Sequence, residues 1–397
     1  MRMDINFTQR DILERGVEEI IEITSLRKKL KSGRKLRVKL GIDPNAPDIH
    51  LGHTAPLWKL RQFQELGHKA VLIIGDYTAS IGDPSGKDET RPSLTEAQIK
   101  GNYKTYEKQA LKILDNKTLE VRYQTEWYKN FNLKDVLNLL RKASVGRLLQ
   151  HETFRERLKK KQQFAVHEII YPFLQGYDSV AVKADVELGA TEQKFNLLMG
   201  RELQKAYGQE QQDIITNPYL LGTDGKEKMS KSLGNYIAIQ DKPTEMFGKV
   251  MSIRDSEIVQ YFELVTPVPF KKVQEIKKLK ITGKTARDLK VQLAGVITEL
   301  YWGKEEAEKA QERFETQFQK RGVSKGLSVV RVSGSDSTII TILVDAGFVS
   351  SKNEARRLVE QGAVYFDNER MAEYNDPIPK RSFILKAGRK MAKIVPK

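Results

Sequence analysis

Cysteine is absent from this chain of 397 residues, which excludes disulfide bonds, thiolate catalysis and zinc sites built from cysteine. No apolar run approaches the roughly 20 residues that a membrane-spanning helix requires, and the first residues lack a secretory hydrophobic segment. These absences predict a cytoplasmic protein that has no membrane partner and no structural metal. The length is sufficient for two or three domains.

Acidic residues are too few to balance the basic ones, since 68 lysines and arginines against 52 aspartates and glutamates give a net charge of +16. A field of this sign attracts polyanions and speeds their association, so nucleic acid is the expected partner. Basic side chains gather within residues 155–161 and 271–290. A lysine excess spread over solvated surfaces is the alternative interpretation.

Histidine is also scarce, yet two of the five histidines flank a glycine in the motif His50-Leu-Gly-His53. The apolar residues 37–43 before it predict a strand, and the apolar spacing from Leu51 onward predicts a helix with Asp48 as its N-cap. A helix N-terminus favours phosphate, and imidazoles donate hydrogen bonds to phosphate oxygens. Taken alone, the motif is equally compatible with two surface histidines.

A second motif, Lys228-Met-Ser-Lys231-Ser, follows the apolar run 214–221 and a glycine-bounded turn. Its lysines are flexible point charges, suited to the charge that develops on a leaving pyrophosphate. For this segment alone, a solvated basic loop is the alternative. The two motifs in this order predict a site that holds the triphosphate of ATP from two sides while its α-phosphorus is attacked.

Strand and helix patterns alternate through the first half of the chain, which predicts an α/β domain with a parallel sheet of the Rossmann type. No G-x-G-x-x-G turn follows the first strand, which argues against a nicotinamide dehydrogenase. Beyond Gly234 the pattern becomes helical, and residues 338–397 return to mixed α+β structure. The expected elements are an amphipathic helix over residues 5–30, strands near 37–43, 70–75, 118–123, 179–185 and 214–220, and helices over 193–203, 244–263, 271–280, 285–302 and 305–320.

Four further segments and the two motifs together resemble the class I aminoacyl-tRNA synthetases, and among these the bacterial tyrosyl-tRNA synthetases, over nearly the whole chain. The resemblance implies two chemical steps. The tyrosine carboxylate attacks the α-phosphorus of magnesium-bound ATP, giving tyrosyl-adenylate and pyrophosphate, and a terminal ribose hydroxyl of tRNA(Tyr) then takes the tyrosyl group. The four segments are Gly41-Ile-Asp43-Pro44, Ile81-Gly-Asp83-Pro-Ser-Gly86, Tyr171-Pro-Phe-Leu-Gln175-Gly-Tyr-Asp178 and Val186-Glu-Leu-Gly189-Ala-Thr-Glu192-Gln193.

The resemblance also implies the domain organisation and the macromolecular partners. The last domain resembles the small αL-type RNA-binding module, in which Lys352, Arg356 and Arg357 on a capped helix would face phosphates of structured RNA. A capping domain with a solvated helix is the alternative there. Members of the family form homodimers, and residues 136–149 and 153–158 are expected at or near the interface. The implied domains are a class I catalytic domain over 1–234, a helical anticodon-recognition domain over 235–321, a Gly/Ser-rich linker over 322–337 and an αL-type RNA-binding module over 338–397.

The implied tyrosine site uses a helix on which Tyr171, Gln175 and Asp178 share one face, at spacing i, i+4, i+7. A pocket selective for tyrosine needs an acceptor for the phenol hydroxyl at the end of an aromatic slot. The resemblance assigns that role to Asp178, and it assigns the substrate ammonium to Tyr171, Gln175 and Asp83. The set is completed by Gln193, which would orient the carboxylate nucleophile, and by Thr78, which would shape the phenol slot.

For the nucleotide, the resemblance implies that His50 and Asn45 bind the γ-phosphate end of ATP. His53 and Gly52 would lie by the ribose and adenine, where a glycine lets a flat ring approach the backbone. Asp43 is also among the residues that the resemblance implies for ATP binding. Magnesium is expected only as part of the ATP complex.

Lysines and arginines on two loops are implied to act during the reaction. Lys228 and Lys231 would close over the pyrophosphate, and Lys87 and Arg91 on a second glycine-containing loop would join them. The ATP-binding set is completed by Gly189 and Glu192.

Three positions depart from the family pattern. Lys39 stands where many tyrosyl enzymes place a second phenol-binding tyrosine, which another bacterial branch also lacks. Ala190 and Glu192 stand where a glycine and an aspartate are usual, next to the expected adenosine. Two alternatives therefore accompany the main interpretation: a tryptophan-specific relative on the same scaffold, and a non-catalytic RNA-binding paralogue. Asp178 with Gln175 favours a phenol over an indole, and both ATP motifs are intact.

Overall fold

The computed structural model describes residues 7–44, 48–83, 95–142, 144–149, 152–163, 165–318, 329–332, 338–367, 369–370, 381–387 and 390–396. The chain divides into two compact units, Met1–Lys309 and Ala310–Lys397, and each is considered by itself. Within the described ranges, no helix is both long and apolar enough to cross a lipid bilayer.

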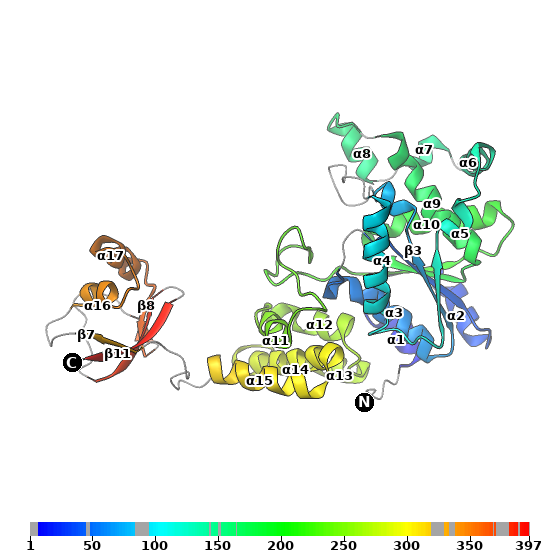
Figure 1. Ribbon diagram of the computed structural model, residues 1–397. Coiled ribbons are helices and arrows are strands. Elements are labelled where there is room, and N and C mark those ends of the chain that lie inside the picture. Colours follow the sequence, from blue (N-terminus) through cyan, green and yellow to red (C-terminus); the bar gives the residue numbers. More distant parts are fainter. Residues whose placement is uncertain are drawn as a thin grey trace. The chain divides into compact units, whose positions relative to one another are not determined.

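A six-stranded sheet forms the centre of the first unit (Figure 1). Every neighbouring pair is parallel except β1, which runs antiparallel to β6 at one edge. Most residues of the inner strands are buried, as expected for parallel strands covered on both faces, although several of them are polar, such as Glu187, Asp213 and Asn217. The predicted Rossmann-type sheet is thereby confirmed. In spatial order, the strands are β1 (Glu19–Ile21), β6 (Asp213–Asn217), β5 (Val186–Ala190), β2 (Arg37–Ile42), β3 (Lys69–Ile74) and β4 (Leu119–Tyr123).

The strand order reverses between β2 and β5, and this reversal creates the binding crevice. From β2 the chain crosses to β3 through helix α3 (Leu51–Glu65), whereas from β5 it crosses to β6 in the opposite direction through α10 (Lys194–Ala206). Right-handed crossovers therefore place α3 and α10 on opposite faces of the sheet. Ligands of such sheets bind outside the carboxyl ends of the strands at the reversal.

Three predictions about the elements next to the sheet are wrong. Residues 5–30 do not form one helix, because Gly16 adopts a positive φ and β1 separates α1 (Gln9–Glu14) from α2 (Ile23–Lys31). Residues 179–185 are not a strand, because α9 (Val166–Val182) continues through the apolar run until Lys183 takes a left-handed conformation. His50 rather than Asp48 is the N-cap of α3.

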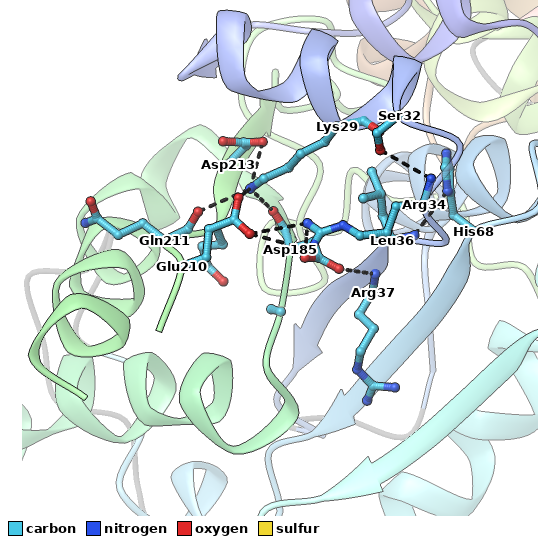
Figure 2. Close-up of polar contacts among 12 residues, drawn as sticks. Lys29, Ser32, Arg34, Leu36, Arg37, His68, Asp185, Glu210, Gln211 and Asp213 are labelled. Carbon is cyan, nitrogen blue, oxygen red and sulfur yellow. Dashed lines mark hydrogen bonds and ion pairs between the residues drawn. The ribbon is translucent and has the colours of Figure 1, made fainter. Parts of the chain in front are cut away.

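A network of charged groups joins the amino ends of the strands on the opposite edge of the sheet (Figure 2). The Lys29 ammonium lies 3.1 Å from the Asp213 carboxylate and donates to the carbonyls of Asp185 and Gln211. The Asp185 carboxylate accepts hydrogen bonds from the Arg34 guanidinium, at 2.7 Å, and from the backbone N–H of Arg37. Helix α2 and the starts of β2, β5 and β6 are thus held together, which leaves the carboxyl edge to the functional site.

Helices complete the first unit. The predicted helix over 244–263 is interrupted, because residues 252–257 form a turn and the short helix η3 (Asp255–Glu257).

The Arg15 guanidinium is buried and donates to four carbonyls at and just after the end of α12 (Ile258–Val265), those of residues 262, 263, 266 and 268. The remaining elements are η1 (Thr78–Ser80), α4 (Glu96–Ala110), α5 (Thr125–Tyr128), α6 (Leu133–Leu140), α7 (Val145–Leu148), α8 (Glu152–Lys159), η2 (Thr191–Gln193), α11 (Pro243–Met251), α13 (Phe270–Lys277) and α14 (Gly283–Trp302). Helix α15 (Lys304–Phe318) begins in the first unit and ends in the second.

Among its described residues, the second unit contains a five-stranded sheet that shares an apolar core with helices α16 and α17. Residues 329–332, which the sequence assigned to the linker 322–337, form β7 and pair in parallel with β11. The prediction missed this strand because its flanking residues are rich in Gly and Ser, although the run Val-Val-Arg-Val itself contains enough β-branched residues to form a strand. The other residues of 322–337 lie outside the described ranges. The elements are β7 (Val329–Val332), α16 (Ile339–Asp345), α17 (Lys352–Glu360), β8 (Val364–Phe366), β9 (Glu369–Arg370), β10 (Phe383–Ala387) and β11 (Lys390–Pro396).

Candidate active site

A cavity of about 600 Å³ opens at the carboxyl ends of the parallel strands, against the start of α3 and one face of α9. Most residues expected to bind tyrosine or ATP line it, although they come from segments far apart in the chain. The structure brings together Asp43, His50, Gly52, His53, Thr78, Asp83, Tyr171, Gln175, Asp178, Gly189, Glu192, Gln193 and Lys228 around this cavity.

Some expected residues lie elsewhere. The Lys231 ammonium donates to the carbonyl of Asp48 at 2.6 Å and is not part of the cavity wall. Lys352, Arg356 and Arg357 are exposed on α17 of the second unit. The remaining three, Asn45, Lys87 and Arg91, lie outside the described residues.

Asp178 is the most deeply buried acid of the cavity. One carboxylate oxygen accepts a hydrogen bond from Gln124 Nε2 at 2.8 Å, and the other accepts one from Trp127 Nε1 at 3.2 Å. Burial raises the pKa of Asp178 to about 7, against the opposing effects of the Lys39 ammonium and the Gln124 hydrogen bond. The carboxylate is therefore oriented by two donors, yet it has been deprived of water.

Gln124 and Trp127 were not identified from the sequence. A signal for Gln124 was available, because it directly follows the predicted strand 118–123. Side chains at the carboxyl ends of parallel strands collect around ligands, and Gln124 indeed lines the cavity. No comparable signal marks Trp127, which reaches Asp178 from α5.

Lys39 does not face the cavity. Its ammonium is fully buried beneath α9, 2.7 Å from the Glu187 carboxylate, and it donates to the Gln175 carbonyl and the Ser179 hydroxyl. Lys39 is thus a paired cation beneath α9, and its side chain does not take the place of a phenol-binding tyrosine in the cavity.

Replacing Lys39 by methionine is expected to lower the free energy of unfolding by about 3–5 kcal/mol, because Glu187 would keep a buried charge without its partner. Urea denaturation followed by circular dichroism measures this change. The double variant Lys39→Met/Glu187→Gln is expected to recover most of the loss. A single variant within 1 kcal/mol of the wild type would contradict the role assigned to the pair.

Two carboxylates at another part of the cavity are held by neutral donors. Asp43 accepts hydrogen bonds from the Tyr171 and Thr78 hydroxyls, each at 2.7 Å. Asp83 accepts one from Gln193 Nε2 at 2.5 Å. Burial and the nearby Asp43 raise the pKa of Tyr171 well above its ordinary value, so Tyr171 remains a neutral donor. Fixed carboxylates of this kind suit an ammonium ligand.

The first motif presents two stacked imidazoles. The His50 and His53 rings lie 3.7 Å apart and are nearly parallel. Burial, together with the ammonium groups of Lys231 and Lys228, lowers the pKa of His50 to about 3, so its ring is neutral at physiological pH. A Cβ on Gly52 would lie 3.1 Å from the His50 ring, which explains the need for glycine between the two histidines.

The second motif reaches both sides of the cavity. Lys228 forms an ion pair with Glu192, which follows β5, and Lys231 contacts the segment before α3. The buried Met229 receives a weak hydrogen bond from the Gly52 N–H through its sulfur, at 3.4 Å. The loop after β6 is therefore anchored next to the first motif, as expected for two parts of one phosphate site.

Comparison with known proteins gives a family and a set of relatives. Residues 31–319 match the family described as tRNA synthetases class I (W and Y), and residues 319–391 match that described as Tyrosine--tRNA ligase SYY-like C-terminal domain. The chain is 48% identical over 384 residues to the Tyrosine--tRNA ligase of Thermotoga maritima, and the match covers 96% of each protein. The corresponding values for the Tyrosine--tRNA ligase of Dehalococcoides mccartyi are 48% over 382 residues and 96% of each.

Solved structures share the fold. The tyrosyl-tRNA synthetase of Archaeoglobus fulgidus, crystallised with L-tyrosine, has a TM-score of 0.63 and 24% identity, covering 76% of this chain and 98% of that one. The tryptophanyl-tRNA synthetase of Plasmodium falciparum has a TM-score of 0.56 and 15% identity, covering 74% and 82%. At these identities the likeness concerns the fold alone.

Proposed function

Because this chain belongs to the class I tRNA synthetases of the tryptophan and tyrosine group, and to the tyrosine–tRNA ligases within it, we propose that it couples tyrosine to tRNA(Tyr) through tyrosyl-adenylate. The observation that carries the choice of amino acid is the buried Asp178 in the cavity wall, which offers an acceptor to a hydroxyl. An indole offers one N–H donor and no acceptor, so it would leave the second amide N–H of Gln124 without an acceptor.

In the first step, an oxygen of the tyrosine carboxylate forms a bond to the α-phosphorus of ATP while the bond to the pyrophosphate oxygen breaks. The carboxylate is already ionised at pH 7, so no general base is required. Positioning and charge stabilisation then supply the rate enhancement. Asp83, Tyr171 and Gln175 hold the substrate ammonium, and Gln193 turns the carboxylate toward phosphorus.

The nucleotide occupies the part of the cavity between the two motifs. His50 donates to the triphosphate as a neutral imidazole, while His53 and Gly52 lie by the ribose and adenine. Lys228 breaks its ion pair with Glu192 and moves with the leaving pyrophosphate. The freed Glu192 carboxylate then accepts hydrogen bonds from the ribose hydroxyls. Magnesium enters with ATP; among the described residues, no cluster of three or more His, Asp or Glu side chains is arranged to hold a metal.

In the second step, a ribose hydroxyl at the end of tRNA(Tyr) attacks the carbonyl carbon of the adenylate and releases AMP. The net charge of +16 favours binding of the polyanion. Exposed Lys352, Arg356 and Arg357 on α17 contact RNA phosphates in the cytoplasm, where tRNA is charged.

Homodimer formation through the region around α6 completes the proposal. Leu133, Leu137 and Val145 are more than half exposed, as is Val166 at the start of α9, which is unusual for large apolar side chains in one region. Sedimentation equilibrium is expected to give twice the mass of the chain. A monomer at micromolar concentration would contradict this part of the proposal.

Tyrosine binding is expected to weaken as the pH falls below about 7. The ionised Asp178 is a much stronger acceptor for the phenol hydrogen than the protonated acid, and burial raises the pKa of Asp178 to about 7. The dissociation constant should then rise up to about tenfold per pH unit in acid, since the ionised fraction falls by that factor. His50 does not interfere, because its pKa lies at about 3. Equilibrium dialysis between pH 5.5 and 8 measures the effect, and a constant affinity would contradict it.

Charging of tRNA(Tyr) transcripts with radiolabelled amino acids tests the whole proposal. The purified protein is expected to charge them with tyrosine and not with tryptophan. Preferential charging of tRNA(Trp) with tryptophan would establish the alternative specificity, and tRNA binding without any charging would establish the non-catalytic paralogue.

A further inference from the structure

We propose that Gln124 is the second group that binds the phenol hydroxyl of tyrosine, donating a hydrogen bond to the same oxygen that donates to Asp178. The inference rests on the proposed function, because it assigns a specificity-determining residue to the amino-acid site. The Lys39 side chain is paired with Glu187 beneath α9 and does not reach the cavity. The phenol hydroxyl of the substrate therefore needs a second partner besides Asp178 from another residue.

Gln124 occupies a favourable position for this role. It follows β4 directly, its side chain is 2% exposed, and it lines the cavity together with Asp178 and Thr78. Its amide nitrogen lies 2.8 Å from the Asp178 oxygen Oδ2. A hydroxyl that donates to Oδ2 of Asp178 from the cavity therefore comes close to the Gln124 amide.

The orientation of this amide follows from its partners. Gln124 Oε1 lies 2.9 Å from both the backbone nitrogen and the hydroxyl oxygen of Thr78. A backbone N–H can only donate, so the oxygen of the amide must face Thr78 and the nitrogen must face Asp178. The reversed amide would place two donors together at Thr78. Gln124 is thus held with its amide nitrogen as a donor toward Asp178.

One donor of Gln124 is left for a ligand. An amide nitrogen carries two hydrogens, and the Asp178 carboxylate takes one of them. Within the part of the chain that the structure describes, no second acceptor is assigned to this nitrogen. Each carboxylate oxygen of Asp178 has capacity for a further hydrogen bond beyond those from Gln124 and Trp127.

A phenol hydroxyl satisfies both groups at once, because it donates to Asp178 and accepts from Gln124. Phenylalanine satisfies neither, and a group that only donates satisfies Asp178 alone. The aryl amine of 4-aminophenylalanine is such a group, since its lone pair is delocalised into the ring and accepts poorly. Discrimination between tyrosine and 4-aminophenylalanine therefore reports on Gln124 separately from Asp178.

The experiment compares kcat/KM for the two amino acids in pyrophosphate exchange at pH 8, in the wild type and in Gln124→Met. The wild type is expected to prefer tyrosine by about tenfold or more, the effect of one unsatisfied buried donor. In Gln124→Met both values fall, and their ratio is expected to approach one. Trp127→Phe is the matched control, because Trp127 also donates to Asp178 but does not line the cavity. Its ratio should equal that of the wild type.

An unchanged ratio in Gln124→Met would overturn the inference and would show that Gln124 only orients Asp178. Thermal melting checks that each variant is folded. If Gln124→Met does not fold, Gln124→Asn serves instead, since its shorter amide no longer reaches the hydroxyl and the same loss of discrimination is expected. A wild type that activates neither amino acid would instead refute the proposed function, so the two failures are distinguishable.

Discussion

Replacement of Asp178 by asparagine is expected to lower kcat/KM for tyrosine in adenylate formation by about 10²–10³-fold, the cost of losing a charged hydrogen-bond partner in a buried site. The neutral amide offers one acceptor where Gln124, Trp127 and the phenol require three hydrogen bonds. Its own N–H groups would also face these donors. The affinity for ATP should stay within about twofold, because Asp178 is assigned no nucleotide contact. Pyrophosphate exchange and fluorescence titration with ATP measure the two quantities.

A variant that removes a carboxylate elsewhere is the control. Asp255→Asn on η3 is suitable, because Asp255 is half-exposed and does not line the cavity. The ratio of kcat/KM for tyrosine to kcat/KM for phenylalanine is about 10⁵ in the established enzymes of this class. In Asp178→Asn this ratio should fall together with kcat/KM for tyrosine. Tyrosine activation by Asp178→Asn within a factor of three of the wild type would contradict the role of this carboxylate.

Replacement of Lys231 by alanine is expected to slow adenylate formation by about 10²-fold while the dissociation constant of tyrosine changes less than about twofold. An ammonium on this loop contributes most when additional negative charge develops on the leaving pyrophosphate, and this additional charge is absent from the ground state. The Lys231 side chain lies at the Asp48 carbonyl, outside the cavity wall, so it must move to act. Rapid-quench measurement of a single turnover gives the rate, and equilibrium dialysis gives the affinity.

Lys226 provides the matched control for this variant, since it is an exposed lysine on the same loop that lines no part of the cavity. Lys226→Ala should react at the wild-type rate. A single-turnover rate unchanged in Lys231→Ala would exclude the assigned role, and an equal loss in both variants would point to a general effect of loop charge.

The site was predictable where its chemistry is encoded locally. Tyr171, Gln175 and Asp178 share a helix face because their spacing matches the helical repeat, and the structure brings all three to one cavity. The two motifs expected to bind ATP were recognisable because each is a short run that follows a predicted strand. Parallel topology then brings these runs to the same edge of the sheet.

Contacts that depend on packing were not predictable from local patterns. The apolar run 179–185 suits a strand and a helix equally, and the helix is formed because α9 packs closely on α10. At Gly176, a Cβ would lie 3.1 Å from the backbone of Gly200. Likewise, nothing near Lys39 in the sequence indicates Glu187, which pairs with it only because β2 and β5 are neighbours.

Pyrophosphate exchange into ATP by the purified wild-type protein, with tyrosine, phenylalanine and tryptophan offered in turn, tests the central claim most directly. Exchange with tyrosine alone is the predicted result, because it requires adenylate chemistry and a pocket that demands a phenol hydroxyl. Exchange that is fastest with tryptophan or phenylalanine, or no exchange by folded protein that still binds tRNA, would contradict the account.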